Sequence, residues 1–260
     1  MDENEQRFLC RPYRDNCIID NKLCNCPCKD GIKKLSWKLT VFEMRDCMFN
    51  DRLSAGKQLA RRLSHYRGDV NAVVLGLPRG GIVTAYAIAK ELHLPLDLIG
   101  VRKIGAPFNR ELAIGAIAEK GEGYFDEHLI ESLGVSKDYI ARTVENEKRV
   151  ILQRLKQYRE HCPKYEIEGK TVILVDDGLA TGATMKAAIK SVHAEGADRI
   201  VVAVPVAPPD TADEIRAEVD ETVCLETPPF FAAVGQFYEE FSQVEDEEVI
   251  ALLRQSRRPN

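Results

Sequence analysis

The segment Val172–Met185, VILVDDGLATGATM, places two carboxylates directly before a loop of small and hydroxyl-bearing residues. An apolar run precedes the carboxylates and a helical pattern follows the loop. The loop should therefore present main-chain N–H groups at a helix N-terminus, where the helix dipole favours an anion. Gly182 allows the backbone to approach that anion closely, and Thr181 and Thr184 offer hydroxyl donors. These features predict a cradle for a phosphate monoester. The predicted cradle comprises Ala180, Thr181, Gly182, Ala183 and Thr184.

Asp176 and Asp177 stand directly before this cradle, although carboxylates and phosphates repel each other. The arrangement is reasonable if the two carboxylates face hydroxyl groups. A ribose with its 5-phosphate in the loop would offer them its 2- and 3-hydroxyls. Because carboxylates and phosphates are the usual ligands of Mg²⁺, the acid pair is also expected to hold magnesium, directly or through water.

Paired acids at the end of a buried strand, followed by Thr-Gly-x-Thr, resemble the phosphoribosyl pyrophosphate motif of type I phosphoribosyltransferases. The resemblance extends over roughly residues 48–260. It implies the fold of that family, a transferase activity, phosphoribosyl pyrophosphate as the donor, release of pyrophosphate and Mg²⁺ as a cofactor. It is strongest to a bacterial group whose acceptor is generally unassigned.

A second motif, GLPRGGI at Gly76–Ile82, ends an apolar strand. In the family the equivalent loop holds pyrophosphate through main-chain amides and, in some branches, an arginine. The resemblance assigns this role to Arg79, since a guanidinium binds a diphosphate in a bidentate way. Gly80 and Gly81 complete the expected loop and permit an unusual backbone, such as a strained or cis peptide. Alone, Pro-Arg-Gly-Gly is equally typical of a common turn.

A third motif, VRKIGAP at Val101–Pro107, resembles the start of the mobile lid in adenine-type relatives. Arg102 and Lys103 would then add positive charge at the pyrophosphate, and the lid would continue through residues 109–111. The alternative is a basic strand end that faces solvent. The residues expected to be catalytic are Asp176, Asp177, Arg79 and Lys103.

Ala180 departs from the hypoxanthine-type pattern, in which an aspartate of the phosphate loop handles the proton of the base. The acceptor is therefore either acidic enough to need no general base, or the base comes from elsewhere, with Glu111 and Glu119 as candidates. Hypoxanthine- or guanine-type specificity is thereby disfavoured, and the acceptor is left open.

Strand and helix patterns alternate beyond residue 50, and the strands are continuous apolar runs. Such runs indicate a parallel sheet covered by helices on both faces. We expect strands at 72–77, 96–101, 171–175, 200–206 and 222–225. Helices are expected from an Asn50 cap to Gly68, at 82–92, after Asp126 and from Ser136 to about 161. Further helices are expected from the end of the Gly-rich turn to about 195, at 211–219 and at 246–254.

Two further segments allow alternatives. Five aromatic residues between 230 and 241 form either a hood over an acceptor base or a hydrophobic strap on the terminal helix. Residues 1–47 hold six of the eight cysteines and are predicted to be an extension to a 48–260 domain. That extension is either weakly folded, metal-binding or an artefact of the chosen start codon, and its C-x-C-x-C spacing is poor for zinc.

The formal net charge of −5 argues against binding to a nucleic-acid backbone. No apolar run reaches the length of a membrane span, and the acidic N-terminus lacks a secretory pattern. We expect a cytoplasmic protein with small-molecule partners that is able to form homo-oligomers. The alternative function is a non-catalytic regulatory protein that binds phosphoribosyl pyrophosphate or a nucleotide.

Overall fold

Five short apolar runs form the central sheet, which has the order β10–β9–β8–β3–β4. All neighbouring strands are parallel, which confirms the predicted sheet. In the pairing of β3 with β8, Gly76 lies opposite Val175. The segments that follow these two strands therefore emerge side by side. The strands are β3 (Ala72–Gly76), β4 (Leu96–Leu98), β8 (Thr171–Val175), β9 (Arg199–Val206) and β10 (Glu221–Glu226).

The computed structural model describes residues 18–19, 22–23, 49–160 and 162–257. The first four form a short antiparallel pair, β1 (Ile18–Ile19) with β2 (Lys22–Leu23). Most of the predicted 1–47 extension, with its cysteines, lies outside the described residues. From Phe49 to Arg257 the described chain belongs to one compact unit. None of the helices in the described part of the chain combines the length and apolarity that a membrane crossing needs.

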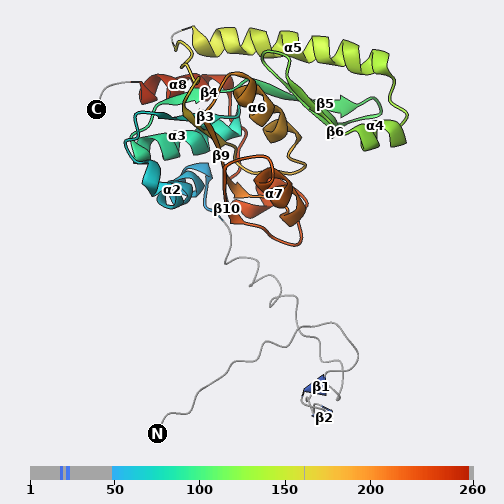
Figure 1. Ribbon diagram of the computed structural model, residues 1–260, viewed down its shortest axis with the longest axis horizontal. Helices are drawn as coiled ribbons and strands as arrows, with labels where there is room; N and C mark the ends of the chain where they lie inside the picture. The colour runs from blue at the N-terminus through green and yellow to red at the C-terminus, as the bar shows by residue number, and fades with distance from the viewer. Residues whose placement is uncertain (1–17, 20–21, 24–48, 161, 258–260) are drawn as a thin grey trace. The chain divides into compact units, whose positions relative to one another are not determined.

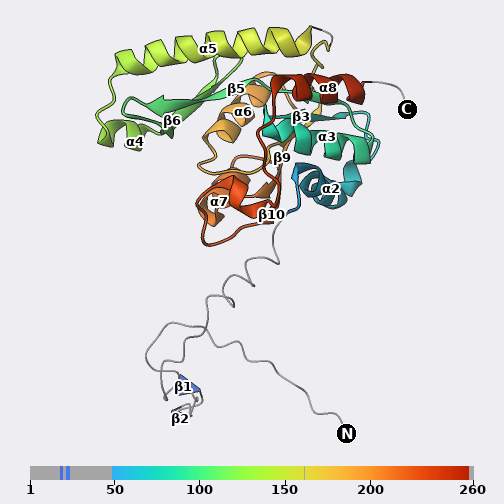
Figure 2. The same cartoon turned by 180° about the vertical axis from the view of Figure 1, so that it is seen from behind.

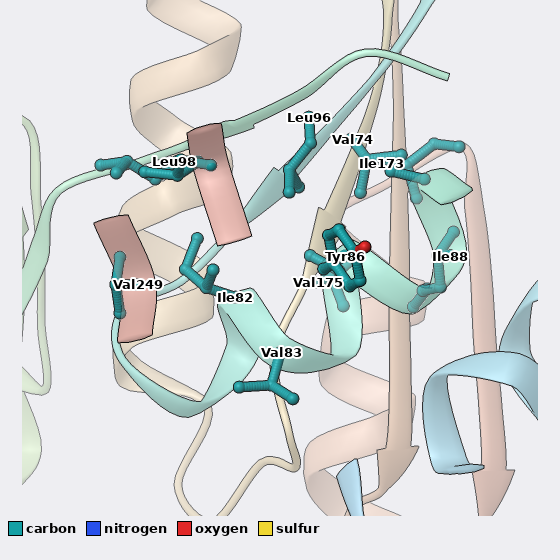
Figure 3. Close-up of a cluster of buried hydrophobic side chains, with 14 of the residues drawn as sticks. Val74, Ile82, Val83, Tyr86, Ile88, Leu96, Leu98, Ile173, Val175 and Val249 are labelled. Atoms are coloured by element: carbon teal, nitrogen blue, oxygen red, sulfur yellow. The ribbon is translucent and has the colours of Figure 1, made fainter. Parts of the chain in front are cut away.

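Helices cover both faces of the sheet, as the strand pattern predicts (Figures 1 and 2). On one face α2 (Arg52–Arg62), α3 (Gly80–Leu92) and α8 (Asp246–Ser256) pack against Val74, Ile173 and Val201. Figure 3 shows part of this core, with Val249 of α8 beside α3. On the other face α6 (Ala183–Ala194) and α7 (Pro209–Arg216) pack against the alternate strand residues, such as Val172 and Val202.

A second, antiparallel sheet lies beside the first and consists of β5 (Val101–Ala106), β6 (Asn109–Ala118) and β7 (Gly123–Phe125). The predicted single strand 96–101 is therefore wrong, because β4 ends at Leu98 and β5 begins in the other sheet. Gly100 stands at the break. A side chain there would start 2.8 Å from Ile151 of α5 (Lys137–Arg159), which packs along this sheet.

Several predicted helix ends are confirmed. Asp126 caps α4 (Glu127–Ser132) and Ser136 caps α5. Others differ: α2 is capped by Asp51 instead of Asn50 and ends at Arg62, before the short 3₁₀ turn η2 (Ser64–Tyr66). The helix predicted from residue 82 starts at Gly80. Two glycines therefore form its first turn, a sequence that propensity alone does not predict.

The segment 237–242, which we call the C-terminal strap, runs parallel to the chain before α2. The Phe49 amide donates to the carbonyl of Phe237, and the Glu239 amide donates back to the carbonyl of Phe49, both at 2.8 Å. The Tyr238 side chain is buried, and its ring centroid lies 5.4 Å from that of Phe49. Part of the aromatic segment thus forms a strap, on the chain before α2 instead of on the terminal helix as predicted. Phe230, which precedes the 3₁₀ turn η3 (Val234–Phe237), is 75% exposed.

The cap of α2 gives a stability prediction. The Asp51 carboxylate accepts the Ser54 amide at 2.6 Å, and the Ser54 hydroxyl lies 3.1 Å from the Asp51 amide. Asp51→Ala should lower the free energy of unfolding by about 1 kcal/mol, because the main-chain amide of Ser54 loses its carboxylate acceptor. Urea denaturation measures the change. The control is Asn50→Ala, which should leave the stability unchanged; an equal loss in both variants would contradict the assignment of the cap.

Candidate functional site

The predicted phosphate cradle lies at the N-terminus of α6. Gly182 is the N-cap, with φ of 71°, a conformation that favours glycine. A Cβ atom there would lie 2.9 Å from Cγ2 of Thr211, the α7 residue whose hydroxyl donates to the carbonyl of Ala180 at 2.9 Å. Ala183 and Thr184 occupy the first helical turn. The five residues of the predicted loop therefore lie together, where unpaired amides and the helix dipole favour an anion.

The acid pair follows β8 directly, precedes this loop in the chain and is partly buried. The Asp177 amide donates to Oδ1 of Asp176 at 2.9 Å. Burial raises the pKa of Asp176 well above its ordinary value, and the charge of Asp177 raises it further. Burial also raises the pKa of Asp177, but the Arg52 guanidinium opposes that rise. Two carboxylates in so little water favour a bound cation or hydroxyl donors.

The loop between β3 and α3 packs directly on the acid pair. A Cβ atom on Gly80 would lie 1.9 Å from Oδ2 of Asp177, and one on Gly81 would lie 2.8 Å from Oδ1 of Asp176. The unusual backbone expected for these glycines occurs one residue earlier, as a cis peptide between Pro78 and Arg79. Glycine is required here because the carboxylates occupy the space of a side chain.

Arg79 heads this loop and is held by the start of α8. Its Nη1 donates to Glu245 at 3.2 Å and lies 3.9 Å from Asp246. The side chain is 26% exposed. The guanidinium therefore lies beside the carboxylates of Glu245 and Asp246. A bound diphosphate would have to replace them as its partners.

Arg102 and Lys103 of β5 both line a hollow beside α5. Arg102 also forms an ion pair with Glu147 of α5. The hollow between β5 and α5 measures about 450 Å³, and its cationic lining residues are Arg102, Lys103, Arg110 and Arg142.

Glu119, one of the two candidate bases, lies away from the cradle. Its carboxylate pairs with Lys164 at 2.7 Å, and the same ammonium contacts Glu195, the C-cap of α6. The cradle is at the other end of this twelve-residue helix, roughly 18 Å away at 1.5 Å per residue. The structure thus gives Glu119 an ion-pairing role.

Arg52 escapes the sequence patterns, and Tyr238, one of the five aromatic residues expected in a hood or strap, contacts the acid pair instead. Arg52, the first residue of α2, donates from Nε to Oδ2 of Asp177 at 2.6 Å. The Tyr238 hydroxyl donates to the main-chain oxygen of Asp177, also at 2.6 Å. Both contacts join segments more than sixty residues apart. The available signal for Arg52 is a basic residue at a helix start, where acids are preferred.

Comparisons with known proteins agree with this geometry. The model of the phosphoribosyl transferase domain matches residues 50–242. Two Mycobacterium tuberculosis proteins provisionally named phosphoribosyl transferases, Rv0571c and MT0597, are each 44% identical over 213 residues. That is 81% of this chain but 47% of theirs, so the chain spans about half the length of these curated relatives.

A solved structure is similar as well. The crystal structure of TT1426 from Thermus thermophilus is 43% identical and matches with a TM-score of 0.68, over 80% of this chain and 98% of that one. The matched family residues include the loop after β3, the acid pair, the loop before α6 and the C-terminal strap. The chain belongs to the phosphoribosyltransferase family.

Proposed function

We propose that this chain transfers ribose 5-phosphate from phosphoribosyl pyrophosphate to a nitrogenous base or related acceptor, with Mg²⁺ and with release of pyrophosphate. The observation that carries the proposal is a pair of partly buried acids with the loop of Gly80 and Gly81 packed on it and with the loop to the N-terminus of α6 directly after it in the chain. A sugar that bears a phosphate at one end and a diphosphate at the other matches this arrangement. Family membership supports the transferase class.

In the proposed reaction the N-terminus of α6 holds the 5-phosphate through the amides of residues 180–184. Asp176 and Asp177 accept the 2- and 3-hydroxyls of the ribose and fix C1 in front of the acceptor. The bond from C1 to the pyrophosphate oxygen breaks as the acceptor atom bonds to C1. Both the developing sugar cation and the departing anion are stabilised by charges that are already in place.

Pyrophosphate is assigned to the loop of Gly80 and Gly81, to Arg79 and to Lys103. The donor set of the acid pair suits Mg²⁺, since Arg52 balances one of the two carboxylates and leaves a net negative charge. The remaining ligands would be donor oxygens and water. Bound there, Mg²⁺ would neutralise charge on the leaving group. Arg102 would bind the pyrophosphate only after its ion pair with Glu147 is broken.

The acceptor is assigned to the open side of the cradle near η3. Val234 lies against Gly178, since a Cβ atom on that glycine would start 2.6 Å from Cγ1 of Val234. Phe231 and Phe237 stack with ring centroids 5.1 Å apart, and Phe230 is exposed beside them. Planar bases stack on such rings. Ala180 supplies no acid–base group, which favours an acceptor that loses its proton readily.

Loss of both carboxylates tests the sugar site. Asp176→Asn combined with Asp177→Asn should abolish pyrophosphate release in the presence of phosphoribosyl pyrophosphate, Mg²⁺ and a panel of bases. The fold should remain, as judged by circular dichroism. Asp213→Asn, on the exposed face of α7, is the matched control and should keep full activity. Near-normal turnover in the double variant would refute the proposal, and saturable donor binding without turnover for any base would favour the regulatory alternative.

A glycine pair tests the phosphate cradle. Gly182→Ala and Gly134→Ala both place alanine at positive φ, at 71° and 61°, and Gly134→Ala should lose about 1 kcal/mol of stability. Gly182→Ala should lose more, because its Cβ atom would start 2.9 Å from Cγ2 of Thr211, whereas the space at Gly134 is open. Gly182→Ala alone should weaken the binding of phosphoribosyl pyrophosphate, by roughly 10- to 100-fold, because charge-assisted bonds to the loop amides are lost. Isothermal titration calorimetry measures the affinity. Equal affinities in the two variants would contradict the assignment.

A further inference from the structure

The first turn of α2 contains an arginine where a helix favours an acid. The turn holds no acidic residue, and Arg52 is its first residue. A cation at a helix N-terminus is disfavoured by the dipole, and this side chain is only 10% exposed. Burial of a guanidinium costs free energy unless it is paired and hydrogen-bonded. The position of Arg52 is therefore unfavourable for α2 itself. The contacts of its side chain with other segments explain why an arginine is found there.

The guanidinium makes three contacts with segments remote in the sequence. Its Nε donates to Oδ2 of Asp177 at 2.6 Å, and its Nη1 donates to the carbonyl of Ser242 at 2.8 Å. The ring of Phe241 covers it, with 3.8 Å between Cζ and the ring centroid. A planar group that stacks and donates in two fixed directions defines an orientation, which a lysine would not do as well.

The pyrophosphate loop packs against the same ion pair. A Cβ atom on Gly80 would lie 2.9 Å from Nε of Arg52, besides its clash with Asp177. Tyr238 of the strap holds the main-chain oxygen of Asp177. The pair of Arg52 and Asp177 is thus the point where the sugar-binding acids, the pyrophosphate loop and the C-terminal strap meet.

We propose that Arg52 is a positioning residue for donor binding: it fixes the Asp177 carboxylate in the orientation that the ribose requires and balances one of the two adjacent acid charges. This inference rests on the proposed function. Without Arg52, two carboxylates would face a polyanionic donor with no fixed cation beside them, and Asp177 would be free to rotate. The donor would then meet more repulsion and fewer aligned acceptors.

The test is a double-mutant cycle read by calorimetry with phosphoribosyl pyrophosphate and Mg²⁺. Arg52→Gln should weaken donor binding by roughly 10- to 100-fold, as expected when a hydrogen-bonded charge pair is broken. Arg52→Lys should recover part of that loss, because lysine restores the positive charge but not the planar geometry by which the guanidinium donates in two fixed directions. In an Asp177→Asn background, with the donor raised to millimolar concentration, Arg52→Gln should change the affinity less than about twofold, because coupled effects do not add.

A matched control separates positioning from helix stability. Asp51→Ala loosens the same end of α2 but keeps the arginine, and it should bind the donor within about twofold of the unchanged protein. The inference is overturned if Arg52→Gln keeps full affinity, if Asp51→Ala loses as much affinity, or if Arg52→Gln costs the same with and without Asp177. Absence of donor binding by the unchanged protein would instead refute the proposed function itself.

Discussion

The parallel pairing of β3 with β8 is the constraint on which the site depends. Both strands end at the same edge, so the turn after Gly76 and the turn after Val175 must share one space. One turn carries two glycines and the other two carboxylates, and the glycines leave room for the acids. The hydrophobic faces of the two strands, Val74 with Ile173 on one side and Leu75 with Leu174 on the other, hold this register.

Much of this arrangement is legible in the sequence, because local physics determines it. The run Val172–Val175 is apolar throughout and bounded by polar residues, and the predicted strand 171–175 coincides with the observed one. Asp126 and Ser136 cap their helices as expected, since a side-chain oxygen before a helical pattern satisfies free amides. The start of α6 follows a different local rule, since glycine at position 182 permits the positive φ found before the helix.

What the sequence does not reveal depends on contacts between distant segments. The break at Gly100 arises because α5, fifty residues later, occupies the space of a side chain there. The motif around Arg102 predicts a place at the pyrophosphate, but its ion pair with Glu147 comes from that same helix. Arg52 and Tyr238 reach the acid pair from opposite ends of the domain. The residue pattern of one chain segment does not indicate which distant segment it contacts.

The packing of β6 on α6 sets the mechanics of the antiparallel sheet. Ala116 meets Ala183 and Ala187 with very small side chains, so strand and helix lie in close contact and the base of the hairpin packs tightly on α6. The ladder between β5 and β6 becomes irregular only from residue 104 onward. The regular strand pairs of the hairpin are therefore the ones held against α6, and the irregular pairs lie nearer its turn.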